Sequence, residues 1–383
     1  MSHRISLSTA DLSGTALRRD YVANLSAEGS SYAQAYDRTT LWYDAFWRDG
    51  RVYLVCPKLM NFAPLIKRAI FRLDQQPVGI AKRRSYQRYD MIELSSPLRP
   101  VEISVTGNGF ELATPVSRDE TGRFAHLNTH FTMTRNNDPE WIRDFAIFSR
   151  KKHGLEAMVL FDNGSTDYPL SAVESALRDA GLRDFVIISV PLPYGRKSTT
   201  NSSRAKFLQT ALMNIARLRI LGRARAVLNA DIDELVWCRE GNVFDKTVGS
   251  YLGFSVFSGE WRYPGPNSGM RARHLSHDHR WQDSPRCPAK YCIVPQGRLG
   301  NFSWDVHRLT GLPFKQYLRS TDMGFIHCSE VSTNWKGVCQ RRGVPADVAD
   351  WKDMELTFDA NTRALLDEGF GKQVPRQQIE AVA

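Results

Sequence analysis

Short apolar runs alternate with helical patterns along the middle of this chain, and this alternation constrains the fold more than any other feature of the sequence. The runs with the character of buried strands are residues 126–134, 157–161, 185–190 and the run that begins at Val227, and the helical segments between them are 139–152, 171–180 and 203–221. Because parallel strands need crossover connections, the alternation predicts an α/β fold with a mainly parallel, Rossmann-like sheet. Ligands of such sheets bind at the carboxyl ends of the strands.

The first of these helices has clear end signals. Asp138 is followed by Pro139 and Glu140, an order in which Asp caps the helix, Pro takes the first helical position and Glu lies in the first turn. His153 and Gly154 follow the last apolar residues, and we expect the helix to end there.

The rest of the chain is expected to form three further regions. Residues 1–40 are polar and rich in Ser, Thr and Ala, so we expect a loosely structured lead-in. Residues 41–120 contain short strand-like runs separated by turns, which predicts a small antiparallel β module that supports or covers the larger domain, or binds a sugar. The α/β domain is then expected over residues 121–345, and a helical tail over residues 346–383.

The composition indicates a globular protein with anionic partners. No apolar stretch approaches the roughly 20 residues needed to span a bilayer, and the start has no signal-peptide core. We therefore expect a cytoplasmic location, with peripheral association at the inner face of the membrane as an alternative. The formal net charge of +10 favours partners such as nucleotides or anionic lipid head groups. Because no nucleic-acid motif accompanies this charge, no nucleic-acid partner is expected.

The six cysteines are sparse for a chain of 383 residues and include no Cys-x-x-Cys pair. This pattern predicts reduced thiols and no disulfide framework. Cys287 and Cys292 lie near three histidines, but their spacing matches no standard zinc ligand set, so we expect no zinc site.

An acidic segment follows the run that begins at Val227. It reads Asn-Ala-Asp-Ile-Asp-Glu and ends at Glu234. If the segment stays extended, Asp231 and Asp233 lie on one face, because side chains alternate along a strand. Two carboxylates at a strand end suit Mg²⁺ or Mn²⁺, which share their remaining positions with waters and substrate phosphates. A solvated acidic turn is the alternative for this segment taken alone.

Two other strand ends carry polar residues that can contact a nucleotide. Thr134, Arg135 and Asn136 end the first strand, and Asp162 and Asn163 open the sequence Asp-Asn-Gly-Ser-Thr-Asp after the second. The carboxylate of Asp162 can accept hydrogen bonds from a base or a ribose. The Gly, Ser and Thr that follow permit a tight turn and can cap the next helix. An ordinary capped turn is the alternative here.

These three motifs together resemble those of the nucleotide-sugar-dependent glycosyltransferases of the GT-A fold, in the family-2-like and family-92-like group. The resemblance implies that Asp162 contacts the nucleotide base, and that Asp231 and Asp233 bind the metal and the diphosphate. It implies a nucleoside-diphosphate sugar, UDP-linked, as the donor, Mn²⁺ or Mg²⁺ as the cofactor, and a glycan or lipid-linked acceptor. The chain departs from the family at Asn137, where Glu is common, and at Asp144, where Glu is followed by Trp.

Segments further along the chain also resemble this family. A stretch like its Lys-x-Ile-x-x-Pro motif precedes His307, which we expect to complete the metal site, with His327 as the alternative. Either histidine alone can also be structural. One of Lys336, Arg341 and Arg342 is expected to neutralise the leaving diphosphate, and a solvated basic surface is the alternative for each.

The reaction that the resemblance implies is transfer of the sugar to an acceptor hydroxyl with inversion. A carboxylate must accept the proton of that hydroxyl. Glu260 is the first candidate, because it lies beside Trp261, on which a sugar can stack. Asp278 and Asp283 are further candidates, and a salt-bridge role is the alternative for each.

Two other functions stay open. A nucleotidyltransferase that acts on a sugar phosphate can use a similar sheet, but such enzymes usually have a Gly-rich loop after the first strand, and residues 132–136 contain no glycine. A non-catalytic carbohydrate-binding protein of the same fold is the other alternative, and the intact Asp162, Asp231 and Asp233 argue against it.

Overall fold

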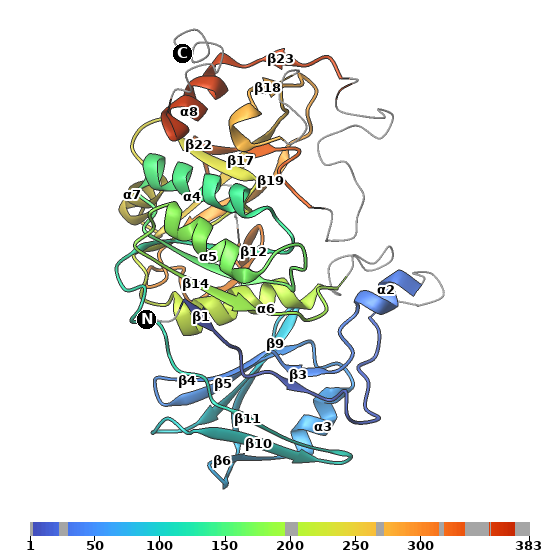
Figure 1. Ribbon diagram of the computed structural model, residues 1–383. Coiled ribbons are helices and arrows are strands. Elements are labelled where there is room, and N and C mark those ends of the chain that lie inside the picture. Colours follow the sequence, from blue (N-terminus) through green and yellow to red (C-terminus); the bar gives the residue numbers. More distant parts are fainter. Residues whose placement is uncertain are drawn as a thin grey trace.

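A nine-stranded mixed sheet dominates the computed structural model, which describes residues 3–22, 30–195, 206–265, 272–313, 318–333, 352 and 354–371 (Figure 1). In order across the sheet, the strands are β1 (Arg4–Ile5), β14 (Asp184–Ser189), β13 (Ala157–Asp162), β12 (Asn128–Thr134), β15 (Ala226–Asn229), β19 (Cys287–Ile293), β17 (Phe254–Arg262), β22 (Arg319–Cys328) and β16 (Glu234–Cys238). The first five are parallel to one another, whereas β19 and β16 are antiparallel to their neighbours. The predicted α/β class with a mostly parallel central sheet is confirmed.

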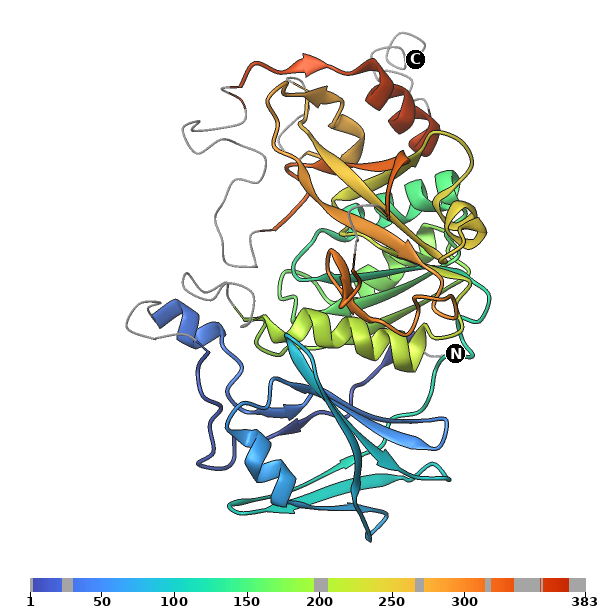
Figure 2. The ribbon, with the colours of Figure 1, turned by 180° about the vertical axis from the view of Figure 1, so that it is seen from behind.

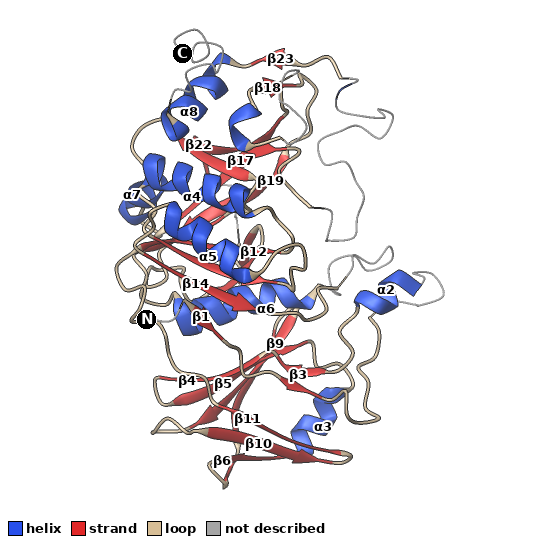
Figure 3. Ribbon diagram, viewed as in Figure 1, coloured by secondary structure: helices blue, strands red, loops and turns tan. Residues whose placement is uncertain are grey.

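Helices pack on both faces of this sheet (Figure 3). One face packs on α4 (Pro139–His153), α5 (Leu170–Asp179), α7 (Val243–Gly249) and α8 (Ala360–Phe370). The other face packs on α6 (Phe207–Ile215), which continues as the π-helix η1 (Ala216–Ile220). Alternation along the strands supplies both cores. On β12, for example, Phe131 and Met133 join the core that contains α6, and the ring of His130 contacts Phe145 of α4.

The β module consists of two four-stranded antiparallel sheets with a core of their own. One contains β4 (Asp44–Arg48), β5 (Arg51–Pro57), β9 (Tyr89–Ser95) and β8 (Ile80–Ser85), and the other β11 (Phe110–Pro115), β10 (Glu102–Gly107), β6 (Ile70–Leu73) and β7 (Gln76–Val78). Helix α3 (Phe62–Arg68) packs into the same core. Seen from behind, α6 lies between these sheets and the central sheet (Figure 2). Tyr43, Phe46 and Tyr89 of the β module share a core with α6, so the two regions are packed against each other.

Short elements complete the described structure. They are β2 (Ala10–Asp11), which pairs with β3 (Thr40–Trp42); β18 (His279–Arg280), which pairs with β23 (Thr357–Phe358); β20 (Ser303–Asp305), which pairs with β21 (Arg308–Thr310); and the helices α2 (Ser30–Ala35) and η2 (His274–Ser276). Within the described ranges, no helix is both long and apolar enough to cross a membrane.

The ends of α4 match the sequence signals. The carboxylate of Asp138 accepts a hydrogen bond from the backbone of Glu140 at 2.8 Å, and Pro139 is the first helical residue. Gly154 follows the helix with a φ of +68°, a left-handed conformation that glycine adopts without a steric cost. Helix α8 lies in the predicted helical tail, most of whose other residues are outside the described ones.

The expectation of a loosely structured lead-in is wrong for the described part of residues 1–40. Strand β1 pairs in parallel with β14 and forms the edge of the central sheet. Arg19 is completely buried, and its guanidinium donates to the backbone carbonyls of Lys58, Asp37 and Thr40 and pairs with the carboxylate of Asp37. The segment is ordered by polar contacts to distant residues, which a search for apolar periodicity does not detect.

Candidate active site

The polar loops that follow β12 and β13 meet at the carboxyl edge of the sheet. The backbone N–H of Asn136 donates to Oγ of Ser165 at 2.8 Å, and its side-chain oxygen accepts from the backbone N–H of Thr166 at 2.7 Å. Asn136 adopts a φ of +56°, a left-handed conformation that asparagine tolerates better than most residues. The structure therefore brings together the two motifs that were predicted to contact the nucleotide.

Thr134 and Arg135 flank this junction differently. Thr134 is buried at the end of β12, whereas the side chain of Arg135 is exposed. The carbonyl of Arg135 accepts a hydrogen bond from Oγ1 of Thr333 at 2.7 Å, and the same hydroxyl lies 3.2 Å from Oδ1 of Asn137. The segment after β22 thus packs on the same edge of the sheet.

Asp162 and Asn163 are engaged in shaping their own turn. The carboxylate of Asp162, whose residue is 2% exposed, accepts hydrogen bonds from the backbone of Gly164 and from the backbone and hydroxyl of Ser165. The side-chain amide of Asn163 donates to the carbonyls of Val190 and Leu192 at 2.7 and 2.8 Å. These contacts are those of a capped turn, and contact with a nucleotide base stays a prediction.

The acidic segment after β15 forms a turn. The backbone N–H of Glu234 donates to the carbonyl of Asp231 at 3.1 Å, and β16 begins at Glu234. The expectation that Asp231 and Asp233 share one face of an extended segment is therefore wrong. Strand β15 ends at Asn229, before the acidic residues. The chain then turns, because β16 pairs antiparallel with β22 at the far edge of the sheet.

Two buried histidines hold this turn in place. A ring nitrogen of His130 donates to the carbonyl of Ala230 at 2.9 Å, and one of His274 donates to that of Ile232 at 2.8 Å. Burial lowers the pKa of His130 to about 4 and also lowers the pKa of His274, so both rings are neutral donors at pH 7. Sequence reasoning missed them, since His130 lies 100 residues before its partner and neither belongs to a motif.

Asp231 faces a buried lysine. Nζ of Lys290 lies 2.9 Å from Oδ2 of Asp231 and 3.0 Å from Oε2 of Glu234, and Lys290 is 1% exposed. Burial by itself would lower the pKa of this ammonium group, but the two carboxylates outweigh it and raise the pKa above its usual range. A permanent positive charge therefore lies between Asp231 and Glu234.

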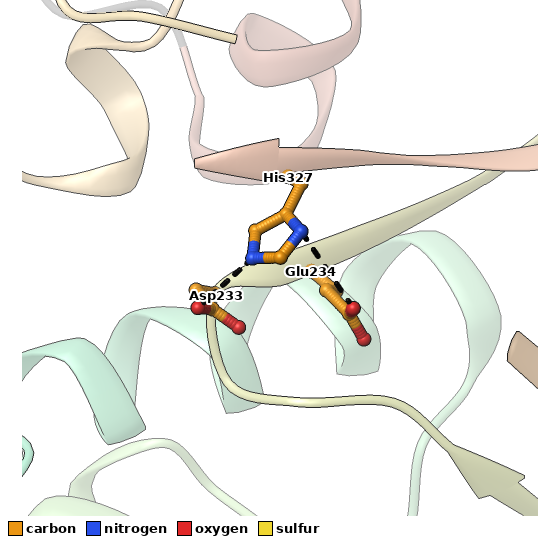
Figure 4. A group of neighbouring side chains, drawn as sticks. All are labelled: Asp233, Glu234 and His327. Atoms are coloured by element: carbon orange, nitrogen blue, oxygen red, sulfur yellow. Dashed lines mark hydrogen bonds and ion pairs between the residues drawn. The ribbon is translucent and has the colours of Figure 1, made fainter. Parts of the chain in front are cut away.

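Asp233 belongs to a second group, which it forms with Glu234 and His327 (Figure 4). Nε2 of His327 lies 3.0 Å from Oδ2 of Asp233, and Nδ1 lies 3.8 Å from Oε1 of Glu234. All three residues are buried, and one potential ligand atom of each lies within 4.8 Å of the others. The ring of His327 stacks on Trp261 with 3.9 Å between centroids, which fixes its orientation. Two carboxylates and an imidazole can hold a divalent cation.

A pocket of about 360 Å³ lies beside these groups. Its lining includes Asp231, Glu234, His327 and His307, so the structure brings the predicted His307 to the same pocket as the acidic turn. His307 is exposed, and its Nδ1 donates to the carbonyl of Ala289 at 3.1 Å.

Cationic and aromatic side chains line other parts of this pocket. Arg88 comes from the loop between β8 and β9 of the β module, and its guanidinium pairs with Asp305 at 3.1 Å. Lys206 precedes α6, with its ammonium group 5.5 Å from the ring centre of Tyr194. Sequence reasoning did not find Arg88, Lys206, Lys290 or Glu234 as site residues. Two of these had a usable signal: Glu234 adjoins the Asp-x-Asp motif, and Lys290 begins the stretch that resembles the Lys-x-Ile-x-x-Pro motif.

Glu260 does not line this pocket. Alternation along β17 places Glu260 and Arg262 on one face and Trp261 on the other, and Trp261 is the residue that contacts His327. The carboxylate of Glu260 is 74% exposed and pairs with Arg262 at 3.0 Å. Glu260 was predicted to act in the site because it adjoins Trp261 in the sequence, but adjacent residues of a strand lie on opposite faces.

Asp278 and Asp283 are also absent from the pocket lining. The carboxylate of Asp278 pairs with His279 at 2.7 Å and with Arg363 of α8 at 3.3 Å, which is the salt-bridge alternative. Asp283 is exposed in the loop between β18 and β19. Lys336, Arg341 and Arg342 lie outside the described residues.

Comparisons with known proteins do not assign a family. No family model matches the chain, and no curated protein matches it. Among solved structures, S. aureus TarS is 16% identical with a TM-score of 0.24, over 37% of this chain and 23% of that chain. A mycobacterial protein is 13% identical with a TM-score of 0.22, over 44% of this chain and 53% of that chain. The matches thus span about a quarter and about half of those two proteins.

Proposed function

We propose that this protein is a glycosyltransferase of the GT-A type, which transfers a sugar from a nucleoside-diphosphate sugar to an acceptor hydroxyl with the help of a divalent cation. The observation that carries the proposal is the pocket at the carboxyl edge of the parallel strands, where a buried group of two carboxylates and a histidine lies beside two cationic side chains. The resemblance of the three loop motifs to this family supports the same function.

The charges around the pocket fit a diphosphate. Arg88 and Lys206 supply positive charge on the side of the β module and α6, and arginine binds phosphate oxygens through parallel hydrogen bonds. Trp261 and Tyr194 offer apolar ring surface for the sugar or the base. The proposed donor is a UDP-linked sugar. The proposed acceptor is a glycan or a lipid-linked molecule, which the protein would reach at the membrane surface.

Asp233, Glu234 and His327 would hold the cation. Mn²⁺ or Mg²⁺ bound there would stabilise the negative charge that develops on the departing diphosphate. Asp231 lies outside this group and pairs with the ammonium group of Lys290. Glu234 also pairs with Lys290, through Oε2, but its Oε1 lies 3.8 Å from Nδ1 of His327. Asp231 is therefore assigned a supporting role, in which it keeps Lys290 beside the cation group.

The test is a panel of nucleotide sugars incubated with the full chain and Mn²⁺ or Mg²⁺. We expect release of a nucleoside diphosphate from at least one donor, loss of this release with a chelator, and its return with added Mn²⁺. Asp233→Asn should reduce the release at least 100-fold, whereas Asp179→Asn, at an exposed position of α5, should leave it unchanged. Full activity of Asp233→Asn would refute the assigned cation group.

The same assay separates the alternatives. A nucleotidyltransferase would consume a nucleoside triphosphate and a sugar phosphate and release pyrophosphate. A non-catalytic carbohydrate-binding protein would show heat of binding with a nucleotide sugar or a glycan, but no released diphosphate under any condition.

A further inference from the structure

A second pocket, of about 380 Å³, lies at the opposite edge of the central sheet from the candidate active site. Gly222 in its lining precedes β15, and Pro295 follows β19, which is antiparallel to β15. Both segments therefore meet at the amino-terminal edge of the parallel strands. The β4–β5 hairpin of the β module closes the pocket from the other side, with Arg48, Asp49 and Tyr53.

Arg217 lines this pocket from η1 although it is only 7% exposed. Its Nε donates to Oδ1 of Asn214 at 3.2 Å, and its Nη1 lies 3.5 Å from the carbonyl of Gly300. Both acceptors are neutral, and no carboxylate in the described ranges forms an ion pair with this guanidinium. Burial lowers the pKa of Arg217. A buried charge without a counter-charge is costly, so an anion would be favoured here.

A second guanidinium converges on the same space. Nη1 of Arg48 donates to the carbonyl of Leu218 at 2.6 Å, and its Nε pairs with Asp49, whose side chain is 68% exposed. Gly222 makes room for it, because a Cβ there would lie 2.6 Å from Nη1 of Arg48. The lining thus carries two positive charges and one negative charge, and the negative charge is the solvent-exposed one.

We propose that this pocket binds a small phosphate-bearing anion, with the guanidinium groups of Arg217 and Arg48 as its cationic contacts. Arginine matches phosphate oxygens through its planar fork of N–H donors, and the buried position of Arg217 strengthens the attraction. The pocket joins a hairpin of the β module to η1 and the loop after β19, so a bound anion holds three separate segments together. This proposal is independent of the proposed enzymatic activity.

The test is calorimetric titration of the full chain at low ionic strength with inorganic phosphate and, separately, with glucose 6-phosphate. Chloride at the same ionic strength is the control for general screening. We expect saturable binding that Arg217→Met and Arg48→Met each weaken at least tenfold. Asp49→Asn should tighten binding several-fold, because it removes the negative charge from the lining. Arg178→Met, at an exposed position of α5 outside both pockets, should leave this binding unchanged.

The two titrants distinguish the sources of the anion. Tighter binding of glucose 6-phosphate identifies a sugar phosphate as the ligand class, and equal affinities identify the phosphate group alone. Unchanged phosphate affinity in Arg217→Met, or no saturable binding to the unmodified chain, overturns the proposal. If Arg217→Met does not fold, the Asp49→Asn variant decides. A phosphate affinity of this variant equal to that of the unmodified chain contradicts the assigned pocket.

Discussion

Replacement of Lys290 by Met tests the charge arrangement of the candidate site most directly. The variant keeps a long side chain but leaves the carboxylates of Asp231 and Glu234 without their shared cation. At 2.9 and 3.0 Å, each pair contributes roughly 6 kcal/mol for an effective dielectric constant of about 20, before desolvation of the ammonium group is subtracted. Removal of one member of a buried ion pair has a net cost of about 3–5 kcal/mol. We expect the free energy of unfolding to fall by this amount.

Urea denaturation of the full chain measures this loss, with Lys67→Met, at an exposed position of α3, as the matched control. The control should change the free energy of unfolding by less than about 0.5 kcal/mol. The triple variant Lys290→Met, Asp231→Asn, Glu234→Gln should recover much of the loss, because no uncompensated charge stays buried. A loss below about 1 kcal/mol in Lys290→Met, with no recovery in the triple variant, would refute the reasoning.

Two further predictions concern a buried histidine and the exposed Glu260. Burial lowers the pKa of His153 to about 4, whereas an unfolded histidine has a pKa of about 6.5, so the unfolded state takes up the extra proton and stability falls as the pH drops from about 6.5 to about 4. His153→Gln should reduce this fall by about 1.4 kcal/mol per pH unit in that window, measured by urea denaturation at pH 7 and pH 5, and an unchanged slope contradicts the assignment. Glu260→Gln should release nucleoside diphosphate within twofold of the unmodified chain, because Glu260 lies on the face of β17 opposite Trp261; a 100-fold drop would restore Glu260 as the catalytic base.

Local signals in the sequence located most of the elements around the sheet. The cap formed by Asp138 and the left-handed Gly154 gave the two ends of α4, because both act within a few residues of the backbone groups that they satisfy. The apolar runs located β12, β13 and β14 to within two residues at each end. Short-range physics was sufficient for these elements.

Contacts between distant segments were not predictable in the same way. Lys290 follows Asp231 by 59 residues, and its ammonium group reaches the acidic turn only because β19 is antiparallel to β15. The sequence left an extended segment and a turn open at the acidic residues, because an Asp-x-Asp triplet is compatible with either backbone. The pairing of β16 with β22 decides for the turn. Glu260 was misplaced because no strand was predicted over residues 254–262, and in β17 the adjacent Glu260 and Trp261 lie on opposite faces.

The lysine also changes what the acidic turn can bind. Asp231, Asp233 and Glu234 carry three carboxylates and Lys290 carries one ammonium group, so these four side chains have a formal net charge of −2. One divalent cation neutralises that charge, whereas the three acids without the lysine would leave a further negative charge facing the phosphates of a donor. In the proposed site, Lys290 would thereby match the charge of the turn to one cation, and it would do so from outside the pocket lining, because the lysine is buried behind Asp231 and Glu234.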